Sequence, residues 1–495
     1  MHRTAIFGPP GTGKTTKLLE IIDQELQSGV LPTEIAFVSF TNAAVNEAKQ
    51  RTAKKFKLKK LDMCWFRTIH SLCFTLSRHP GQQVITPYDL KVFAQIYRGI
   101  DFSGNPRRKE RGDIALEAYT LARSAQMSLK DAWMASTDWV VHDFSIMEEF
   151  VEAYEKWKIT TGKVDFQDMI DNYLAHPIKT DVRVSIIDEV QDLNGQQWEV
   201  IENTFSDSER QYIAGDDDQS IYAWAGSRVD KMLAYPADEK IILHQSYRCP
   251  VKVKAVADLI LSRIKTREPK EWLSREGGSG SFKMYGDYAF VPFGKYRDET
   301  WFVLSRSDFM LDDIRWWLKS IGEIYKDENG WSINNRVAQK IMTVVKLQKG
   351  EAVPVESLRR AIWDSRLDYN VLDLVHLPSK GNVTADEAKI DVKECDPISI
   401  FSRIIGDSEE VDYYQRAMAI NKDLTLSPKI ELSTIHKAKG READNVVVIL
   451  DQTGNILDAA LLNPDNEHRN WYVAVTRAKK RLMCIMASSV HGYDL

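Results

Sequence analysis

The 495-residue chain has no apolar run approaching the roughly 18 residues that a transmembrane helix needs. Its opening residues, "MHRTAIFGPPG", also lack the long apolar core of a secretory signal peptide. Basic residues are not in excess, because 66 Lys and Arg stand against 71 Asp and Glu, for a net charge of −5. These absences exclude a wholly basic nucleic-acid-binding surface, although not a local basic groove, and predict no membrane partner.

Cysteine is scarce, and its placement excludes two further classes of protein. The five cysteines have neither CxxC nor Cys/His spacing, which argues against a zinc site and against a disulfide framework. A reducing, cytoplasmic compartment is therefore expected. The length exceeds what one hydrophobic core organises, so we expect about two to four domains.

Short apolar runs typical of buried strands alternate with helical stretches, which predicts an α/β fold with parallel sheets flanked by helices. Two helix-rich regions, 85–163 and 330–424, interrupt this alternation and are interpreted as inserts. "SREGGSGS" (274–281) is a Gly/Ser connector. The runs are "TAIFG" (4–8), "EIAFVSF" (34–40), "VSIIDE" (184–189), "RQYIAG" (210–215), "ETWFVLSR" (299–306) and "NVVVIL" (445–450).

The segment "AIFGPPGTGKTT" (5–16) matches the phosphate-binding pattern G-x-x-x-x-G-K-[ST] between a predicted strand and a predicted helix. Its glycines allow backbone N–H groups to face phosphate oxygens, and the helix N-terminus adds its positive dipole end. Lys14 is expected to reach the β- and γ-phosphates, and Thr15 to ligate Mg²⁺. Nucleotide-binding residues predicted here are Gly8, Gly11, Gly13, Lys14, Thr15 and Thr16.

A second apolar run, "VSIIDEVQD" (184–192), ends in two carboxylates. Oxygen ligands suit Mg²⁺, so Asp188 is the candidate metal ligand and Glu189 the candidate general base for hydrolysis. Together with the phosphate loop, the pair predicts ATP hydrolysis with ATP and Mg²⁺ as cofactors.

A series of further motifs resembles, in order, superfamily 1 DNA helicases of the UvrD/Rep type in a compact version. They are "FVSFTNAAVNEAKQR" (37–51), "RTIHSL" (67–72), "VDFQDMI" (164–170), "GDDDQSIYAWAG" (215–226), "QSYRCP" (245–250), "WFVLSRSD" (301–308), "LSTIHKAKGREADNVVVI" (432–449) and "NWYVAVTRAKKRL" (470–482).

The resemblance implies two RecA-like P-loop NTPase domains, each with a mainly helical accessory insert. Domain 1 would comprise 1–84 and 164–246 with its insert at 85–163. Domain 2 would comprise 247–329 and 425–495 with its insert at 330–424.

Residues around ATP follow from the same resemblance. Arg248 and Arg477 match positions that supply positive charge to the γ-phosphate, and Gln219 matches the residue that senses it. Tyr247 matches an adenine-stacking aromatic, with packing in the core as the alternative. Glu442 matches a ribose- or interface-contacting glutamate, with a surface role as the alternative.

Single-stranded nucleic acid is held by aromatic stacking together with backbone phosphate contacts. Tyr222, Trp224 and Phe40 are the predicted stacking residues, with the core as the alternative for Phe40. "RTAKKFKLKK" (51–60) and "NPRRKERGD" (105–113) would add phosphate contacts or are solvated charged segments. Polar side chains predicted to contact phosphates are Thr41, Asn42, Thr68, His70, Thr434 and His436, with a structural role as the alternative for His70.

Two departures from the family pattern bear on specificity. Lys14 lies only thirteen residues after Met1, so the family's glutamine-bearing segment that recognises adenine is absent from this sequence. Thr16 stands where relatives commonly have arginine. Selectivity for ATP over other nucleoside triphosphates is therefore left open.

The resulting hypothesis is an ATP-dependent DNA helicase that moves 3′→5′ on single-stranded DNA. Its partners would be single-stranded DNA, junctions of single- and double-stranded DNA, and replication or repair proteins, in a bacterial cell or phage-infected host. Two alternatives stay open: a translocase that displaces proteins with little unwinding, and a non-catalytic, nucleotide-switched recruitment module. The three aspartates at 216–218 are expected to meet cations near the Mg²⁺–ATP site or to cap the following turn.

Overall fold

The computed structural model describes residues 1–78, 81–97, 100–103, 110–136, 144–365 and 377–495. Most of the basic stretch at 105–113 lies outside these residues. The chain divides into two compact units, each described by itself. The first comprises 1–249, 258–277 and 463–472, and the second comprises 250–257, 278–462 and 473–495. Among the described residues, no helix is both long enough and apolar enough to cross a membrane.

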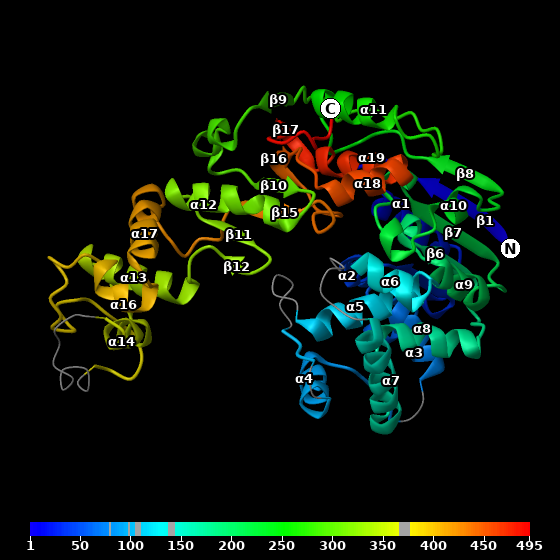
Figure 1. Ribbon diagram of the computed structural model, residues 1–495, viewed down its shortest axis with the longest axis horizontal. Helices are drawn as coiled ribbons and strands as arrows, with labels where there is room; N and C mark the ends of the chain where they lie inside the picture. The colour runs from blue at the N-terminus through cyan, green and yellow to red at the C-terminus, as the bar shows by residue number, and fades with distance from the viewer. Residues whose placement is uncertain (79–80, 98–99, 104–109, 137–143, 366–376) are drawn as a thin grey trace. The chain divides into compact units, whose positions relative to one another are not determined.

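A six-stranded parallel sheet forms the centre of the first unit, in the order β3-β2-β6-β7-β1-β8 (Figure 1). Four of its strands are the apolar runs predicted from the sequence, because strands covered on both faces must be apolar throughout. The strands are β1 (His2–Phe7), β2 (Ile35–Ser39), β3 (Phe66–Thr68), β6 (Val184–Ile187), β7 (Arg210–Gly215) and β8 (Glu239–Ile242).

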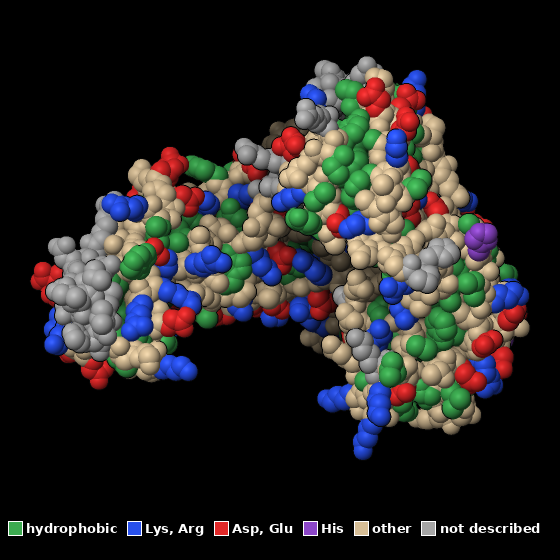
Figure 2. All heavy atoms as spheres, turned by 90° about the horizontal axis from the view of Figure 1, so that it is seen from below, with side chains coloured by type: hydrophobic (Ala, Val, Ile, Leu, Met, Phe, Trp, Pro, Cys, Tyr) green, Lys and Arg blue, Asp and Glu red, His purple; other side chains and the backbone are tan. Residues whose placement is uncertain are grey.

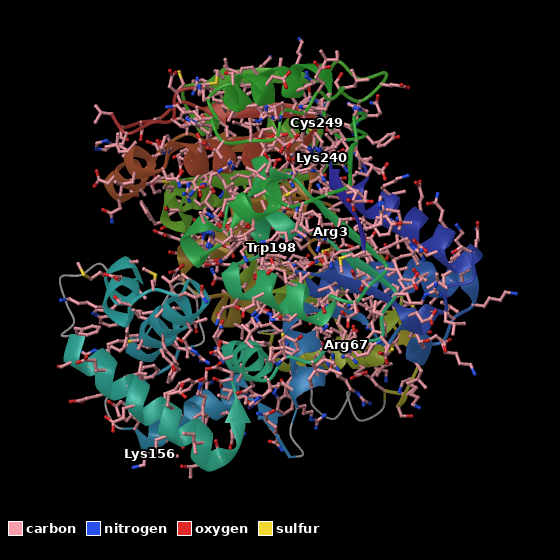
Figure 3. All side chains as sticks on the ribbon, turned by 90° about the vertical axis from the view of Figure 1, so that its right-hand side faces the viewer. Arg3, Arg67, Lys156, Trp198, Lys240 and Cys249 are labelled. Atoms are coloured by element: carbon pink, nitrogen blue, oxygen red, sulfur yellow. The ribbon has the colours of Figure 1, made fainter. Side chains whose placement is uncertain are left out.

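Helices cover both faces of this sheet, and successive strand residues supply the two cores. Ile6 and Phe37 contribute to the cluster that includes α1, whereas Phe7 and Val38 contribute to the cluster that includes α9. Trp198 of α9 is buried in the latter cluster (Figure 3). The helices are α1 (Lys14–Gln27), α2 (Asn42–Phe56), α3 (Ile69–Ser77), α8 (Phe166–Ala175), α9 (Gly195–Thr204) and α10 (Val229–Leu233).

The insert predicted at 85–163 is helical and has its own aromatic core. Phe93, Phe150 and Tyr154 pack in that core, with Phe93 and Tyr154 rings 5.5 Å apart at 74°. A short parallel pair, β4 (Gln83–Val84) with β5 (Lys163–Val164), joins the two ends of the insert. Its helices are α4 (Pro87–Ile96), α5 (Arg111–Ser124), α6 (Leu129–Ser136) and α7 (Phe144–Thr161).

The second unit is built on a seven-stranded sheet in the order β12-β11-β15-β10-β16-β17-β9. All its neighbouring strands are parallel except β11 and β12, which form an antiparallel pair. The strands are β9 (Ser281–Tyr285), β10 (Trp301–Ser305), β11 (Tyr325–Asp327), β12 (Gly330–Trp331), β15 (Ile430–Thr434), β16 (Ala443–Ile449) and β17 (Ala478–Ile485).

The insert predicted at 330–424 is mainly helical, as expected. Its own buried cluster includes Ile341, Leu358 and Phe401. It contains α13 (Asn335–Gln348), α14 (Val355–Trp363), α16 (Ser402–Ile405), α17 (Ser408–Ile420) and the pair β13 (Val353–Pro354) with β14 (Asn382–Val383). The remaining helices are α11 (Val251–Leu261), α12 (Asp312–Ser320), α18 (Gly454–Leu462) and α19 (Pro464–Val475).

Segments from the second half of the chain belong to the first compact unit. The stretch 258–277, which includes the end of α11, and the stretch 463–472, at the start of α19, are grouped with residues 1–249. The boundary after Gly277 falls within the predicted Gly/Ser connector. On the molecular face of Figure 2, acidic and basic side chains are interspersed, in keeping with the nearly balanced charge.

Candidate functional site

The loop between β1 and α1 has the backbone geometry of a phosphate-binding loop. Gly11 and Gly13 have φ of 73° and 81°, in the left-handed region that favours glycine. The Lys14 ammonium donates a hydrogen bond to the Gly8 carbonyl across 2.9 Å, and a Cβ at Gly8 would lie 2.2 Å from Lys14 Cγ. The lysine therefore folds back over its own loop, with Thr15 following in the first turn of α1.

Asp188 and Glu189 follow β6 at the same edge of the sheet as the phosphate loop, because β6, β7 and β1 are parallel neighbours. Asp188 is buried, and its carboxylate accepts the Glu189 N–H across 2.9 Å. Burial, reinforced by the Glu189 charge, raises the pKa of Asp188 to about 7, whereas Lys14 acts in the opposite direction. Glu189 has φ of 56°, an uncommon backbone conformation for a residue with a side chain.

The aspartates after β7 are fully buried and face protein cations. Asp216 caps the short turn Asp217–Gln219 by accepting the Asp218 N–H across 3.3 Å. Capping of this turn was one of the two roles expected for the aspartates. Asp218 accepts two hydrogen bonds from the Arg267 guanidinium, at 2.8 and 2.6 Å. Lys270 forms ion pairs with all three carboxylates. The cations that these aspartates meet are therefore side chains of the first unit.

The segment that carries Tyr247 and Arg248 lies directly against the phosphate loop within the first unit. The Ser246 hydroxyl donates to the Pro10 carbonyl across 2.7 Å, and the Tyr247 N–H donates to the Gly11 carbonyl across 2.8 Å. A Cβ at Gly11 would lie 2.4 Å from Arg248 Cβ. The Tyr247 side chain is 71% exposed, which contradicts the alternative that it packs in the core.

Three aromatic side chains form a continuous cluster on the same unit. The Phe40 and Tyr222 rings stack with centroids 5.9 Å apart, and Tyr222 meets Trp224 edge-on at 6.3 Å. Phe40 is 38% exposed and Trp224 63% exposed, so the core alternative for Phe40 is wrong. Exposed, adjoining rings of this kind offer stacking surfaces for bases.

Two of the predicted phosphate contacts, Thr41 and Thr68, are helix N-caps. The Thr41 hydroxyl accepts the Ala44 N–H at the start of α2, and the Thr68 hydroxyl accepts the Ser71 N–H at the start of α3. Asn42 is the exposed first residue of α2. Two helix N-termini, which favour anions, thus lie among the predicted phosphate contacts. In the basic stretch at 51–60, Arg51 pairs with Glu47 and Lys55 pairs with Asp23.

Comparison with known protein families decides the assignment. Residues 2–240 match the UvrD/REP helicase N-terminal domain, and residues 405–489 match the UvrD-like helicase C-terminal domain. The chain belongs to the UvrD-like family of ATP-dependent DNA helicases. The resemblance inferred from its motifs is confirmed.

Individual relatives of this UvrD-like chain are distant in sequence. A probable DNA helicase II homolog of Mycoplasma pneumoniae is 23% identical over 98% of this chain and 82% of its own length. A putative ATP-dependent DNA helicase of Bacillus subtilis, YjcD, is 27% identical over 54% of this chain. The ATP-dependent DNA helicase PcrA of Staphylococcus aureus is 24% identical over 55% of it. The matches cover only 37% and 40% of those last two proteins.

Four further predicted site residues of this UvrD-like chain lie in the second unit: Thr434, His436, Glu442 and Arg477. Arg477 is buried, and its guanidinium donates to the carbonyls of Val473 and Arg441 at 2.9 and 3.3 Å. Glu442 is exposed with Lys479 Nζ 3.6 Å away. Thr434 is the last residue of β15, and His436 follows two residues later.

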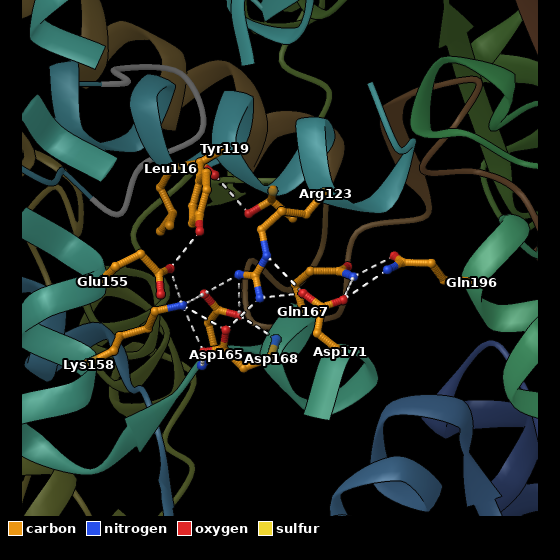
Figure 4. Close-up of polar contacts among 11 residues, drawn as sticks. Leu116, Tyr119, Arg123, Glu155, Lys158, Asp165, Gln167, Asp168, Asp171 and Gln196 are labelled. Carbon is orange, nitrogen blue, oxygen red and sulfur yellow. Dashed lines mark hydrogen bonds and ion pairs between the residues drawn. The ribbon is translucent and has the colours of Figure 1, made fainter. Parts of the chain in front are cut away.

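A largely buried ionic cluster fastens the first insert to α8 (Figure 4). Arg123 of α5 and Lys158 of α7 both pair with Asp165 and Asp168, and Arg123 also pairs with Asp171. Burial alone would raise the pKa of Asp168, but Lys158 and Arg123 lower it overall. Charged groups buried in this way are tolerated because they are paired.

Sequence reasoning missed three residues that the structure adds. Phe166, in "VDFQDMI", is 61% exposed and meets the His70 ring edge-on at 5.8 Å. Burial lowers the pKa of His70, which favours its neutral form at pH 7. Gln191 donates a hydrogen bond to the Glu189 carboxylate, and Lys270 pairs with the three aspartates at 216–218. Phe166 could have been predicted from the sequence, because it is an aromatic residue directly after the helix-capping Asp165. The sequence around Lys270 contains no pattern that predicts its role.

Proposed function

We propose that this chain couples Mg²⁺-dependent ATP hydrolysis to 3′→5′ movement along single-stranded DNA and thereby unwinds duplex DNA. The observation that carries the proposal is the phosphate loop, the Asp188–Glu189 pair and the Phe40–Tyr222–Trp224 cluster within one unit. Relatives named as ATP-dependent DNA helicases support the coarse activity. Polarity rests on the motif resemblance alone.

The residues of the nucleotide site divide the chemistry between them. Lys14 and the loop N–H groups would hold the phosphates, and Glu189 would accept the proton of the attacking water. The Thr15 hydroxyl and the Asp188 carboxylate are oxygen donors of the kind that Mg²⁺ prefers, so the side chains present fit this ion. Bound Mg²⁺ would neutralise phosphate charge.

Tyr247 and Arg248 would complete the nucleotide site from the segment that lies against Pro10 and Gly11 of the phosphate loop. The exposed Tyr247 ring is available to stack on a base, and Arg248 is held beside Gly11. Arg477 and Glu442 are proposed to act from the second unit. For Arg477 this requires its guanidinium to exchange its carbonyl partners for phosphate oxygens.

The aromatic cluster is the proposed platform for the DNA strand, with Phe166 and His70 as an extension of it. Stacking on Phe40, Tyr222 and Trp224 is tolerant of sequence, which suits a protein that moves along DNA. The capping residues Thr41 and Thr68, together with Asn42, would place helix N-termini beside phosphates. Thr434 and His436 are proposed to contact the strand from the second unit.

The test is steady-state ATP hydrolysis with and without poly-dT for the wild type, Lys14→Ala and Glu189→Gln. We expect DNA to stimulate the wild type and both variants to lose turnover, with Glu189→Gln retaining nucleotide binding. Equal turnover by the wild type and Glu189→Gln would overturn the catalytic assignment and favour a nucleotide-switched binding module.

A further inference from the structure

A chain of three hydrogen bonds connects the proposed base Glu189 to the proposed phosphate sensor Gln219. The Gln191 side-chain amide donates to the Glu189 carboxylate across 2.5 Å. The oxygen of the same amide accepts the Asp216 N–H across 3.1 Å. The Asp216 carboxylate in turn accepts the Gln219 amide across 2.6 Å. Gln191, Asp216 and Gln219 are buried, and only the Glu189 end of the chain of contacts is partly exposed.

The position of Gln191 demands both a donor and an acceptor at the end of one side chain. Glutamine provides both, whereas glutamate would offer only acceptors to a neighbouring carboxylate. Space for the amide depends on Gly215, where a Cβ would lie 2.4 Å from Gln191 Oε1. The Ser220 hydroxyl donates to the Gln191 carbonyl across 2.9 Å, which ties the loop after β6 to the turn after β7.

Asp216 is held on its other side by Lys270. The ammonium lies 3.3 Å from Asp216 and 2.9 Å from Asp218, and the Glu268 N–H donates to Asp217 across 2.8 Å. Although the three carboxylates lie close enough together to hold a metal ion, the Lys270 ammonium pairs with all of them. Asp216 therefore has a fixed orientation toward Gln219.

We propose that Gln191 is a positioning residue that makes the orientation of the Glu189 carboxylate depend on the turn that carries Gln219 and the DNA-facing Tyr222. A buried polar network with all members paired responds as a unit rather than by independent adjustments. DNA seated on Tyr222 and Trp224 shifts this turn, and Gln191 transmits the shift to Glu189. This inference rests on the proposed function, and it names the residues through which DNA would stimulate ATP hydrolysis.

The test compares two buried glutamines of the first unit that each use both ends of the amide. Gln191→Met removes the hydrogen bonds through which Gln191 joins Glu189 to Asp216, which we call the relay. Gln211→Met is the matched control, because Gln211 donates to Ser185 and accepts from Tyr235 at 3.2 and 2.6 Å, away from the relay. Both methionines keep the side-chain length while removing the hydrogen bonds. ATP hydrolysis with and without poly-dT, poly-dT affinity and thermal unfolding are measured for both.

We expect Gln191→Met to lower the DNA-stimulated kcat by roughly ten- to a hundredfold, the kinetic equivalent of one hydrogen bond to a charged group. The KM for ATP and the affinity for poly-dT should stay close to those of the wild type. Gln211→Met should lose similar thermal stability and keep its DNA stimulation. Equal kinetic losses in both variants, or a change confined to KM, would overturn the relay.

Ser220→Ala provides a milder interruption if Gln191→Met does not fold. It removes the hydroxyl that ties the two loops and should lower the DNA-stimulated kcat without raising the KM for ATP; an unchanged kcat would count against the relay.

The wild-type assay separates failure of the proposed function from failure of the relay. If the wild type shows no DNA-stimulated hydrolysis, the proposed function itself fails. If the wild type is stimulated and Gln191→Met is stimulated equally, only the relay fails.

Discussion

The Gln219 side chain donates to the Asp216 carboxylate across 2.6 Å, only three residues before the Tyr222 ring that stacks on Phe40. The two contacts serve different proposed ligands. The buried Gln219 is assigned to the nucleotide, whereas the aromatic rings are assigned to the DNA strand. The short stretch "GDDDQSIYAW" would therefore connect the proposed site of hydrolysis with the proposed surface for base stacking.

Trp224→Ala should weaken binding of single-stranded DNA by roughly 5- to 150-fold, since stacking contributes about 1–3 kcal/mol per base. DNA stimulation of ATP hydrolysis should then require correspondingly higher DNA concentrations, while nucleotide binding is retained. The control is Trp316→Ala, which removes a 70% exposed tryptophan of α12 that is not assigned to the site. Fluorescence titration with poly-dT checks both, and loss of nucleotide binding in Trp224→Ala would contradict the assignment.

Gly11→Ala should abolish most ATP turnover, because the new Cβ would meet Arg248 Cβ at 2.4 Å and displace the segment that carries Tyr247. Gly29→Ala is the matched control, since Gly29 also has positive φ, 93°, but has open space around its Cβ position. Left-handed backbone conformation costs an alanine about 1–2 kcal/mol at either position. Urea unfolding measures the backbone strain that both variants share, and the ATPase rate measures the additional effect of the clash with Arg248. Equal ATP turnover by both variants would contradict the contact between Gly11 and Arg248.

The sequence predicted the parts of the fold that local pattern determines. The central strands Ile35–Ser39 and Val184–Ile187 are continuous apolar runs because helices cover both faces of their sheet. The phosphate loop was also predictable, since its glycines and Lys14 act within one short segment. The edge strand Glu239–Ile242 was not anticipated, because only part of it is apolar and an edge strand pairs on one side.

Contacts between distant segments could not be predicted from one sequence. Arg267 and Asp218 are 49 residues apart, and nothing in the local pattern around Arg267 indicates its partner. The same holds for Arg123 and Asp171, which are separated by 48 residues. Motif resemblance placed residues near ATP or DNA, but it gave no reason for three consecutive aspartates. Their burial against Lys270 supplies that reason.

Lys158→Met should destabilise the first unit by about 3–5 kcal/mol, the usual cost of removing one partner of a buried ionic cluster. The Lys158 side chain is 4% exposed, and Asp165 and Asp168 would lose one of their two cations. Lys179→Met serves as the control, because Lys179 and Asp207 are 62% and 61% exposed and such pairs contribute about 0–1 kcal/mol. Urea unfolding measures both; similar small losses would contradict the structural role of the cluster.

Cysteine labelling should follow burial rather than position in the chain. None of the five cysteines, all of which belong to the described residues, forms a disulfide bond in the structure. Cys64, which is partly exposed, should react with iodoacetamide at pH 8 in the native protein. Burial raises the pKa of Cys73 to about 12, so that this thiol should react only when the first unit opens. Mass spectrometry of labelled peptides checks the order, and early labelling of Cys73 would contradict the packing of α3.

The most direct measurement of the central claim is strand displacement on matched DNA substrates with a 3′ tail, a 5′ tail or blunt ends, in the presence of Mg²⁺ and with ATP, GTP and CTP compared. We predict ATP-dependent displacement on the 3′-tailed duplex, little on the other two, and none by Glu189→Gln. Equal or better displacement on the 5′-tailed duplex would contradict the proposed direction. Stimulated ATP hydrolysis without displacement of any of the three would contradict unwinding itself.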